Sequence, residues 1–232
     1  MIGLNSLRFV SYEGPRTMRR VVSVLALVLG IAAAGVPAAT AQQLAMRAPE
    51  AASPYKRVYG ATQPPYGFVQ FCEQSPEECK AGPLEESRFY ATPERLSQLD
   101  EIKRSVNRAI QPMTDLENYG VTEYWTIPEN GKGDCEDYAL MKRHMLIAHG
   151  WPIGSMLMTV VRDEKGEGHA VLTARTAQGD FILDNKTDDV KIWHKTGYEF
   201  VMRQSFLNPR VWISLDPSDN SAPAAIAGVE HR

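Results

Sequence analysis

Cys135 is the side chain whose neighbours most favour covalent chemistry. It follows Gly131-Lys132-Gly133-Asp134 and stands at the start of a predicted apolar helix. Unpaired backbone N–H groups at a helix N-terminus stabilise an anion, so a thiol placed there has a lowered pKa. The alternative is a buried structural cysteine, a common role for an unpaired cysteine. Its position and the neighbouring glycines favour a nucleophile.

His169 is the best-placed base for such a nucleophile. It follows two glycines and begins the apolar run Ala170-Val171-Leu172, so it stands at the mouth of a predicted core strand. Of the other four histidines, two lie two or more turns along the helix of Cys135, too far to touch it. One more is in the C-terminal tail. His194 stays open as an alternative.

Asp184 is the predicted acceptor that orients the base. It closes the next strand, after Phe181-Ile182-Leu183, and Asn185 could serve the same purpose. A tight turn at Gln178-Gly179 would pair Asp184 with Thr173 rather than with His169. The pairing therefore requires a longer turn, centred near residue 176, or a bulge. Either shift is an even number of residues, so the side chains stay on one face.

Three acids, Asp134, Glu136 and Asp137, surround Cys135. Nearby negative charge disfavours a thiolate. Asp134 could cap the helix, and Asp137 suits its first turn. Glu136 has no such explanation. A bound hard cation would neutralise the group, and carboxylate oxygens suit Ca²⁺. A solvated acidic helix start is the equally weighted alternative.

Two helices precede the strands and position these residues. Thr92-Pro93-Glu94 is typical of a helix N-terminus, and apolar residues then recur at three- and four-residue spacing as far as Ile110. Pro112 ends this helix. The second helix begins at Asp134 or Cys135 and runs to His149. It is apolar on most sides, which predicts a place in the domain centre.

After the second helix the pattern changes to strands. We expect a buried strand over residues 155–161, two strands joined by a turn over 169–176 and 180–184, and weaker strands over 198–202 and 211–215. Helices followed by a mainly antiparallel sheet indicate an α+β domain.

The two ends of the chain are predicted to lie outside the domain. Residues 1–41 have an arginine pair, an apolar run and the small-residue site Ala39-Thr40-Ala41, which indicates a secretory signal peptide and export to the periplasm. Met18 is a possible alternative start. Residues 42–66 are predicted to be a linker or arm, 67–215 the domain, and 216–232 a flexible tail. No later stretch is long enough to span a bilayer after cleavage.

Charge and cysteine usage agree with an exported protein that does not bind nucleic acid. Without the four arginines and one glutamate of residues 1–41, 21 basic and 27 acidic residues remain, a net charge of −6. A net negative charge of this size does not indicate the basic surface that nucleic-acid binding requires. Cys72 and Cys79 are close enough to form a small disulfide loop in an oxidising compartment. This pairing leaves Cys135 as the free thiol.

Three motifs together resemble the bacterial transglutaminase-like cysteine peptidases. They are Gly133-Asp134-Cys135-Glu136-Asp137-Tyr138-Ala139, then Gly168-His169-Ala170-Val171-Leu172, then Leu183-Asp184-Asn185. Upstream, Asp115, Tyr119-Gly120 and Tyr124-Trp125 also fit the family pattern. The resemblance covers roughly residues 68–205.

The resemblance implies a papain-like transglutaminase core in which the cysteine-bearing helix packs on the sheet. It implies Cys135 as nucleophile, His169 as base and Asp184 as orienting residue, in a periplasmic protease that acts on a protein substrate. The best-studied branch of the family depends on calcium and cleaves surface adhesins. Its metal ligands would map onto Asp115, Asp134 and Glu136.

Three functions stay open from the sequence. The first is a calcium-dependent endopeptidase that forms a thioester acyl-enzyme. The second is a transglutaminase or amidase that uses the same triad with a different acceptor. The third is a non-catalytic binding module that kept the fold. The oligomeric state does not follow from the sequence.

Overall fold

The computed structural model describes residues 53–83 and 88–218. The predicted signal peptide, residues 1–41, and most of the predicted tail lie outside this described part. Among the described residues, no helix is long and apolar enough to cross a membrane.

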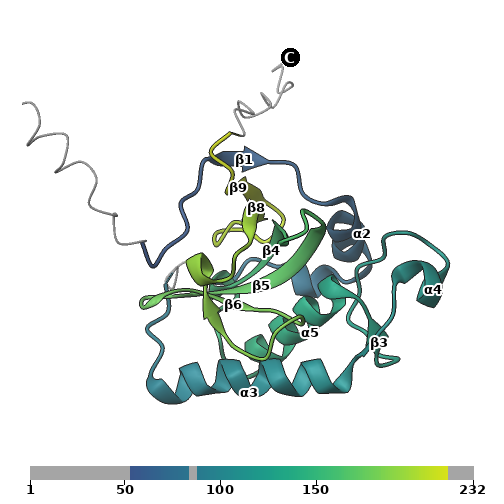
Figure 1. The fold of residues 1–232 in the computed structure, drawn as a ribbon, viewed down its shortest axis with the longest axis horizontal. Helices are drawn as coiled ribbons and strands as arrows, with labels where there is room; N and C mark the ends of the chain where they lie inside the picture. The colour runs from purple at the N-terminus through teal and green to yellow at the C-terminus, as the bar shows by residue number, and fades with distance from the viewer. Residues whose placement is uncertain (1–52, 84–87, 219–232) are drawn as a thin grey trace, which may run out of the picture. The chain divides into compact units, whose positions relative to one another are not determined.

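A seven-stranded sheet, antiparallel at every pairing, is the centre of the fold (Figure 1). The strand order is β1-β9-β8-β4-β5-β6-β7. The strands are β1 (Gly60–Thr62), β4 (Met156–Arg162), β5 (Gly168–Thr176), β6 (Gly179–Leu183), β7 (Lys191–Ile192), β8 (Glu199–Gln204) and β9 (Trp212–Ser214). Together with the helices, this sheet confirms the predicted α+β class.

The two predicted helices are present, and two more appear. The α-helices are α2 (Tyr66–Gln74), α3 (Pro93–Ala109), α4 (Asp115–Tyr119) and α5 (Cys135–Ala148). Thr92 caps α3 by accepting a hydrogen bond from the Arg95 N–H. Short 3-10 helices occur at η1 (Pro76–Cys79), η2 (Ile153–Ser155) and η3 (Trp193–Lys195), and the short strands β2 (Gln111–Pro112) and β3 (Lys132–Gly133) pair in parallel.

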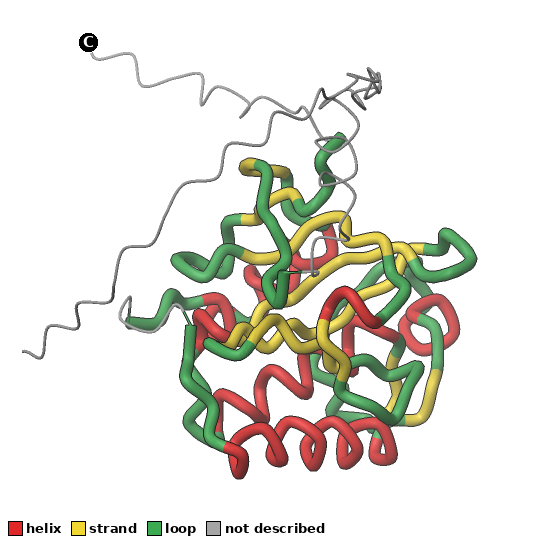
Figure 2. Tube along the Cα trace, turned by 60° about the vertical axis from the view of Figure 1, so that its left-hand side comes forward, coloured by secondary structure: helices red, strands yellow, loops and turns green. Residues whose placement is uncertain are grey.

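The sheet separates two apolar clusters. The larger cluster packs α3 and α5 against one face of the sheet, through residues such as Val106, Leu140 and Leu172. Figure 2 shows both helices on that side of the strands. The smaller cluster lies on the other face and includes Val171 and Phe200. Strand β5 is therefore buried on both faces, which fixes the side-chain direction of every residue along it.

The turn between β5 and β6 differs from both predicted solutions. Thr176 pairs with Gly179, so the turn is tight and consists of Ala177 and Gln178, without a longer loop or a bulge. Leu172 pairs with Leu183, and one further step sets Asp184 opposite Val171. His169 is then the diagonal neighbour of Asp184, a separation that two long side chains can bridge.

Residues 53–65, within the stretch predicted to be a linker or arm, lie on the sheet. Trp193 donates to the Ser53 carbonyl near β7, and β1 pairs with β9 at the opposite edge. The segment then continues into α2. At the end of α2 a disulfide joins Cys72 to Cys79, as predicted, and leaves Cys135 as a free cysteine.

Candidate active site

Cys135 is the first residue of α5, at the point where the helix N-terminus meets β5. Asp134 occupies the N-cap position, although its side chain makes no capping hydrogen bond. The Ala170 N–H of β5 donates to the Cys135 Sγ at 3.4 Å. The sulfur is therefore held between the helix terminus and the strand that carries His169.

His169 and Asp184 form a buried pair, with 4% and 3% of their surfaces exposed. The His169 Nε2 lies 2.8 Å from the Asp184 Oδ1. This contact leaves the His169 Nδ1 as the ring nitrogen able to exchange a proton. The contact is diagonal across β5 and β6, whereas the sequence predicted a directly opposed pair.

The other contacts of Asp184 come from three further elements. Tyr198 donates its hydroxyl to the second carboxylate oxygen at 2.5 Å, and the Lys186 N–H donates to the first at 3.0 Å. Asn107 of α3 donates to the Asp184 carbonyl at 3.1 Å. Hydrogen bonds from His169 and Tyr198 hold the pKa of Asp184 well below its usual range, against its burial.

A cleft of about 470 Å³ opens over these residues. Cys135 and His169 both line it, so the two residues border one space. The opposite wall is formed by the end of the N-terminal segment and by the loop after α4: Gln63, Pro64, Pro65, Thr122, Glu123 and Trp125. A peptide carbonyl placed in this cleft could meet the thiol and the imidazole together.

His194, the alternative base, lies elsewhere. It belongs to η3 and packs edge-on against Trp193, with ring centroids 5.6 Å apart. It is not among the residues that line the cleft of Cys135. Asn185, the alternative orienting residue, follows Asp184, and it is the aspartate that contacts His169.

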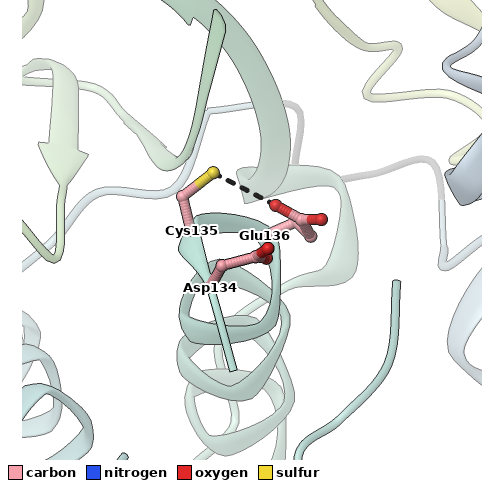
Figure 3. Close-up of side chains that lie close together, drawn as sticks. All are labelled: Asp134, Cys135 and Glu136. Atoms are coloured by element: carbon pink, nitrogen blue, oxygen red, sulfur yellow. Dashed lines mark hydrogen bonds between the residues drawn. The ribbon is translucent and has the colours of Figure 1, made fainter. Parts of the chain in front are cut away.

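The thiol of Cys135 is protonated in this arrangement. Burial raises the pKa of Cys135 well above its usual value, and the charge of Glu136 and a hydrogen bond to it act in the same direction. The sulfur lies 3.1 Å from the Glu136 Oε2, as Figure 3 shows. The sequence-based expectation of a lowered thiol pKa therefore does not hold for this arrangement of side chains.

Three aspartates converge near the start of α5, and one of them, Asp134, precedes Cys135 in the chain. One carboxylate oxygen each from Asp115, Asp134 and Asp137 lies within 4.8 Å of the others. The Tyr124 N–H donates to Asp115 and the Thr126 N–H to Asp137, the latter at 3.0 Å. In each of the three aspartates the remaining oxygen is buried and has no hydrogen-bond partner among the described residues.

This arrangement fits a hard cation. Burial raises the pKa of Asp115 to about 6 and that of Asp137 to about 8, and repulsion from Asp134 adds to both. Three carboxylates held close together, each with one oxygen that lacks a partner among the described residues, offer the oxygen donors that Ca²⁺ prefers. Gly133 makes room for the group, because a Cβ there would lie 2.3 Å from the Asp137 Oδ2.

The acidic group contains two of the three predicted metal ligands. Asp115 and Asp134 belong to it, together with Asp137, which the sequence had suggested only as a favourable first-turn residue. Glu136 instead groups with Asp134 and the Cys135 sulfur. Burial and Asp134 raise the pKa of Glu136 to about 9. The helical positions explain the difference, since Glu136 and Asp137 point about 100° apart around α5.

Comparison with known proteins identifies one family and one group of structures. The family model described as bacterial transglutaminase-like cysteine proteinase BTLCP matches residues 58–220. A search of curated proteins finds no match.

Three forms of LapG from Legionella pneumophila are among the similar solved structures. The first is 24% identical with a TM-score of 0.42, and the match covers 49% of this chain and 65% of that protein. An EGTA-treated form gives the same identity and TM-score. A calcium-bound form is 22% identical, with a TM-score of 0.46 and coverage of 57% of this chain and 75% of that one. The first match thus spans about two thirds of that LapG chain.

Proposed function

Since the chain belongs to the bacterial transglutaminase-like cysteine proteinases and is a cysteine peptidase of that kind, we propose that it is an exported, calcium-dependent endopeptidase acting through Cys135, His169 and Asp184. One observation carries the proposal: the free thiol at the start of α5 and His169, whose ring is held by the buried Asp184, line a single cleft. Family membership supplies a protein as the substrate.

The first half of the reaction forms an acyl-enzyme. The Cys135 thiol gives its proton to the His169 Nδ1, and the sulfur attacks the carbonyl carbon of a peptide bond in the cleft. The carbon–nitrogen bond then breaks, and His169 donates the proton to the leaving amine. Asp184 stays ionised throughout and holds the ring through Nε2. The backbone N–H of Cys135 is suited to stabilise the oxyanion.

The second half releases the product. Water gives a proton to the His169 Nδ1 as its oxygen attacks the thioester carbon. The carbon–sulfur bond breaks, a carboxylic acid leaves, and the proton returns from His169 to the Cys135 sulfur. If an amine entered in place of water, the same steps would give a transglutaminase product.

The calcium ligands in this proposal are Asp115, Asp134 and Asp137, with Glu136 beside them. A calcium ion would add positive charge near the N-terminus of α5 and so favour the thiolate form of Cys135. The support is the convergence of three carboxylates, each of which has one buried oxygen without a partner among the described residues.

Export to the periplasm is supported by the disulfide and by the signal-peptide pattern. A Cys72–Cys79 bond persists only in an oxidising compartment. Localisation of an epitope-tagged chain tests export. The mass of the processed chain, measured by mass spectrometry, tests cleavage after Ala41.

The test of the activity is hydrolysis of a proteome-derived peptide library by the purified protein. It is run with Ca²⁺ or with a chelator, and beside Cys135→Ala. We expect cleavage that needs both the cysteine and calcium, while Cys135→Ala retains the wild-type circular dichroism spectrum. A lysine-bearing acceptor peptide in a parallel reaction detects acyl transfer.

Two outcomes would overturn the proposal. Cleavage by Cys135→Ala at the wild-type rate would exclude the thiol as nucleophile. No cleavage, with a Cys135 that a thiol reagent labels no faster than a free peptide cysteine, would favour the binding module.

A further inference from the structure

An ion pair outside the cleft joins the two loops next to His169 and Asp184. The Lys186 Nζ lies 2.8 Å from the Asp163 Oδ2. Asp163 begins the loop between β4 and β5, and His169 is the second residue of β5. Lys186 lies two residues after Asp184, in the loop that follows β6. Neither member of the pair is among the residues that line the cleft.

The pairing of β5 with β6 does not extend to His169 and Asp184. The ladder ends at Leu172 and Leu183, so within the described chain residues 168–171 of β5 have no partner on β6. On its other side this part of β5 pairs with β4. Contacts outside the β5–β6 ladder must therefore hold the loop of Asp184 close to the imidazole.

Lys186 supplies such a contact through both its side chain and its backbone. Its ammonium pairs with Asp163, and its N–H donates to the Asp184 Oδ1 at 3.0 Å. The His169 Nε2 lies 2.8 Å from the same oxygen. A continuous series of contacts therefore runs from Asp163 through Lys186 and Asp184 to the imidazole. It starts in the loop that leads into the strand of His169.

Asp163 is a fixed anchor for this series. Its side chain is 5% exposed, and its Oδ1 accepts the N–H groups of Lys165 at 2.9 Å and Glu167 at 3.0 Å. The Asp163 N–H in turn donates to the Glu167 carbonyl at 2.9 Å. One carboxylate oxygen thus shapes the loop between β4 and β5, and the other contacts Lys186.

Stability of the fold does not account for the ion pair. The side chain of Lys186 is 41% exposed, and a pair with one member in water contributes little to the free energy of unfolding. Asp163 would also keep both loop hydrogen bonds without the lysine. Loss of the pair should therefore change the placement of the Asp184 loop more than it changes stability.

We propose that Asp163 and Lys186 are positioning residues: their ion pair holds the Asp184 carboxylate against the His169 Nε2 and so fixes the orientation of the imidazole. The proposal rests on the proposed triad, and neither residue touches the substrate. A displacement of about 1 Å at a catalytic group can lower a rate about a hundredfold. Asp184 keeps its other contacts, with Tyr198 and Asn107, so we expect a smaller loss.

Lys186→Met tests the proposal, with Lys80→Met as the matched control. Lys80 pairs with Glu77 at 2.6 Å, and neither of these residues lines the cleft. For Lys186→Met we expect kcat to fall about tenfold with KM unchanged and a melting temperature within about 2 °C of wild type. Lys186→Arg keeps a cation for Asp163 and should restore most of the activity. Lys80→Met should leave kcat unchanged.

Asp163→Asn separates positioning from a direct effect of the lysine charge. The amide oxygen can still accept both loop N–H groups, whereas the amide nitrogen then faces the ammonium and cannot pair with it. We expect the same fall in kcat as in Lys186→Met. The double variant should lose no more than either single variant, because all three lack the same interaction. Wild-type kcat in Asp163→Asn would overturn the proposal.

A second readout does not need activity. In a Cys135→Ala background, the ¹H NMR resonance of the proton on the His169 Nε2 reports its hydrogen bond to Asp184. A weaker hydrogen bond moves this resonance upfield. We expect that shift in Lys186→Met and in Asp163→Asn, and no shift in Lys80→Met. Lys186→Gln takes the place of the methionine variant if that variant does not fold.

The outcomes are distinguishable. A wild-type protein without peptidase activity removes the proposed function, while the resonance still tests the connection from Asp163 to His169. Unmoved resonances in both variants, together with kcat within about twofold of wild type, overturn the positioning role. A clear fall in melting temperature with the resonance unmoved assigns the ion pair a structural role and overturns it as well.

Discussion

At the scale of single residues, Tyr198 offers the sharpest test of the site. Its hydroxyl donates to the Asp184 Oδ2 at 2.5 Å, and its ring packs edge-on against His169. Tyr198→Phe removes the hydrogen bond and keeps the ring. A bond to a charged group contributes about 1.5–3 kcal/mol. We therefore expect kcat to fall about tenfold to a hundredfold, with KM unchanged, in steady-state hydrolysis of the peptide found by the library.

The matched control is Tyr55→Phe. Tyr55 also donates a hydroxyl, to the Ala177 carbonyl, but it lies outside the cleft. This variant should lower the melting temperature slightly and leave kcat unchanged. Equal losses of activity in both variants would mean that Tyr198 supports only the fold.

The residues of the site differ in how far the sequence predicts them. Cys135 and His169 stand at element boundaries that glycine, apolar runs and helix signals mark, so a single sequence suffices to propose them. Tyr198 reaches Asp184 from the segment before β8, and no local pattern indicates that contact. The sequence does not point to Asp137 as a member of the proposed metal site, because its place in the first helical turn already accounts for a carboxylate.

At the scale of elements, the Cys72–Cys79 disulfide connects the end of α2 to η1. Closing a loop this short lowers the entropy of the unfolded chain, which stabilises the folded state by about 2 kcal/mol. The double variant Cys72→Ala/Cys79→Ala should lower the free energy of unfolding in urea by that amount. Because neither cysteine lines the cleft, activity at a temperature where the variant is folded should match that of the wild type. A loss of activity in the folded variant would mean that α2 positions the cleft wall.

Long periodic elements were predictable, and short ones were not. Helix α3 has both a capping threonine and a regular apolar face, and β4, β5 and β6 have apolar runs bounded by turns. Helix α4 has only five residues and β3 only two. Elements of that length depend on tertiary contacts, such as the Met113 N–H bond to the Gly133 carbonyl, rather than on local periodicity.

At the scale of the whole molecule, the buried acids predict how stability depends on pH. Burial raises the pKa of Asp115 to about 6 and of Asp137 to about 8. Without a cation, the folded state therefore binds more protons than the unfolded state above about pH 4, and its stability falls as these groups ionise. The pKa of Asp163 is lowered to about 2, and that of Asp184 is also lowered. The stability that these two ionised carboxylates give the fold is therefore lost only at more acidic pH. Lys142 acts in the opposite direction, but only above about pH 7.

The window from about pH 5 to about pH 7 therefore reports on Asp115 and Asp137, and on Glu136, whose pKa burial and Asp134 raise to about 9. In a chelator, the melting temperature measured by calorimetry should fall by several degrees across this window. With calcium the fall in melting temperature should be smaller, because the cation stabilises the ionised carboxylates. The increase in melting temperature caused by calcium should therefore grow with pH. The Asp137→Asn side chain cannot ionise, so this variant should show a smaller fall in the chelator, with Asp115 and Glu136 accounting for the rest. Asp134→Ala should remove the calcium effect. A chelator profile that is flat or rises in the wild type would show that burial and repulsion do not raise the pKa of these carboxylates in the folded protein, and the electrostatic reason for placing calcium beside Cys135 would be lost.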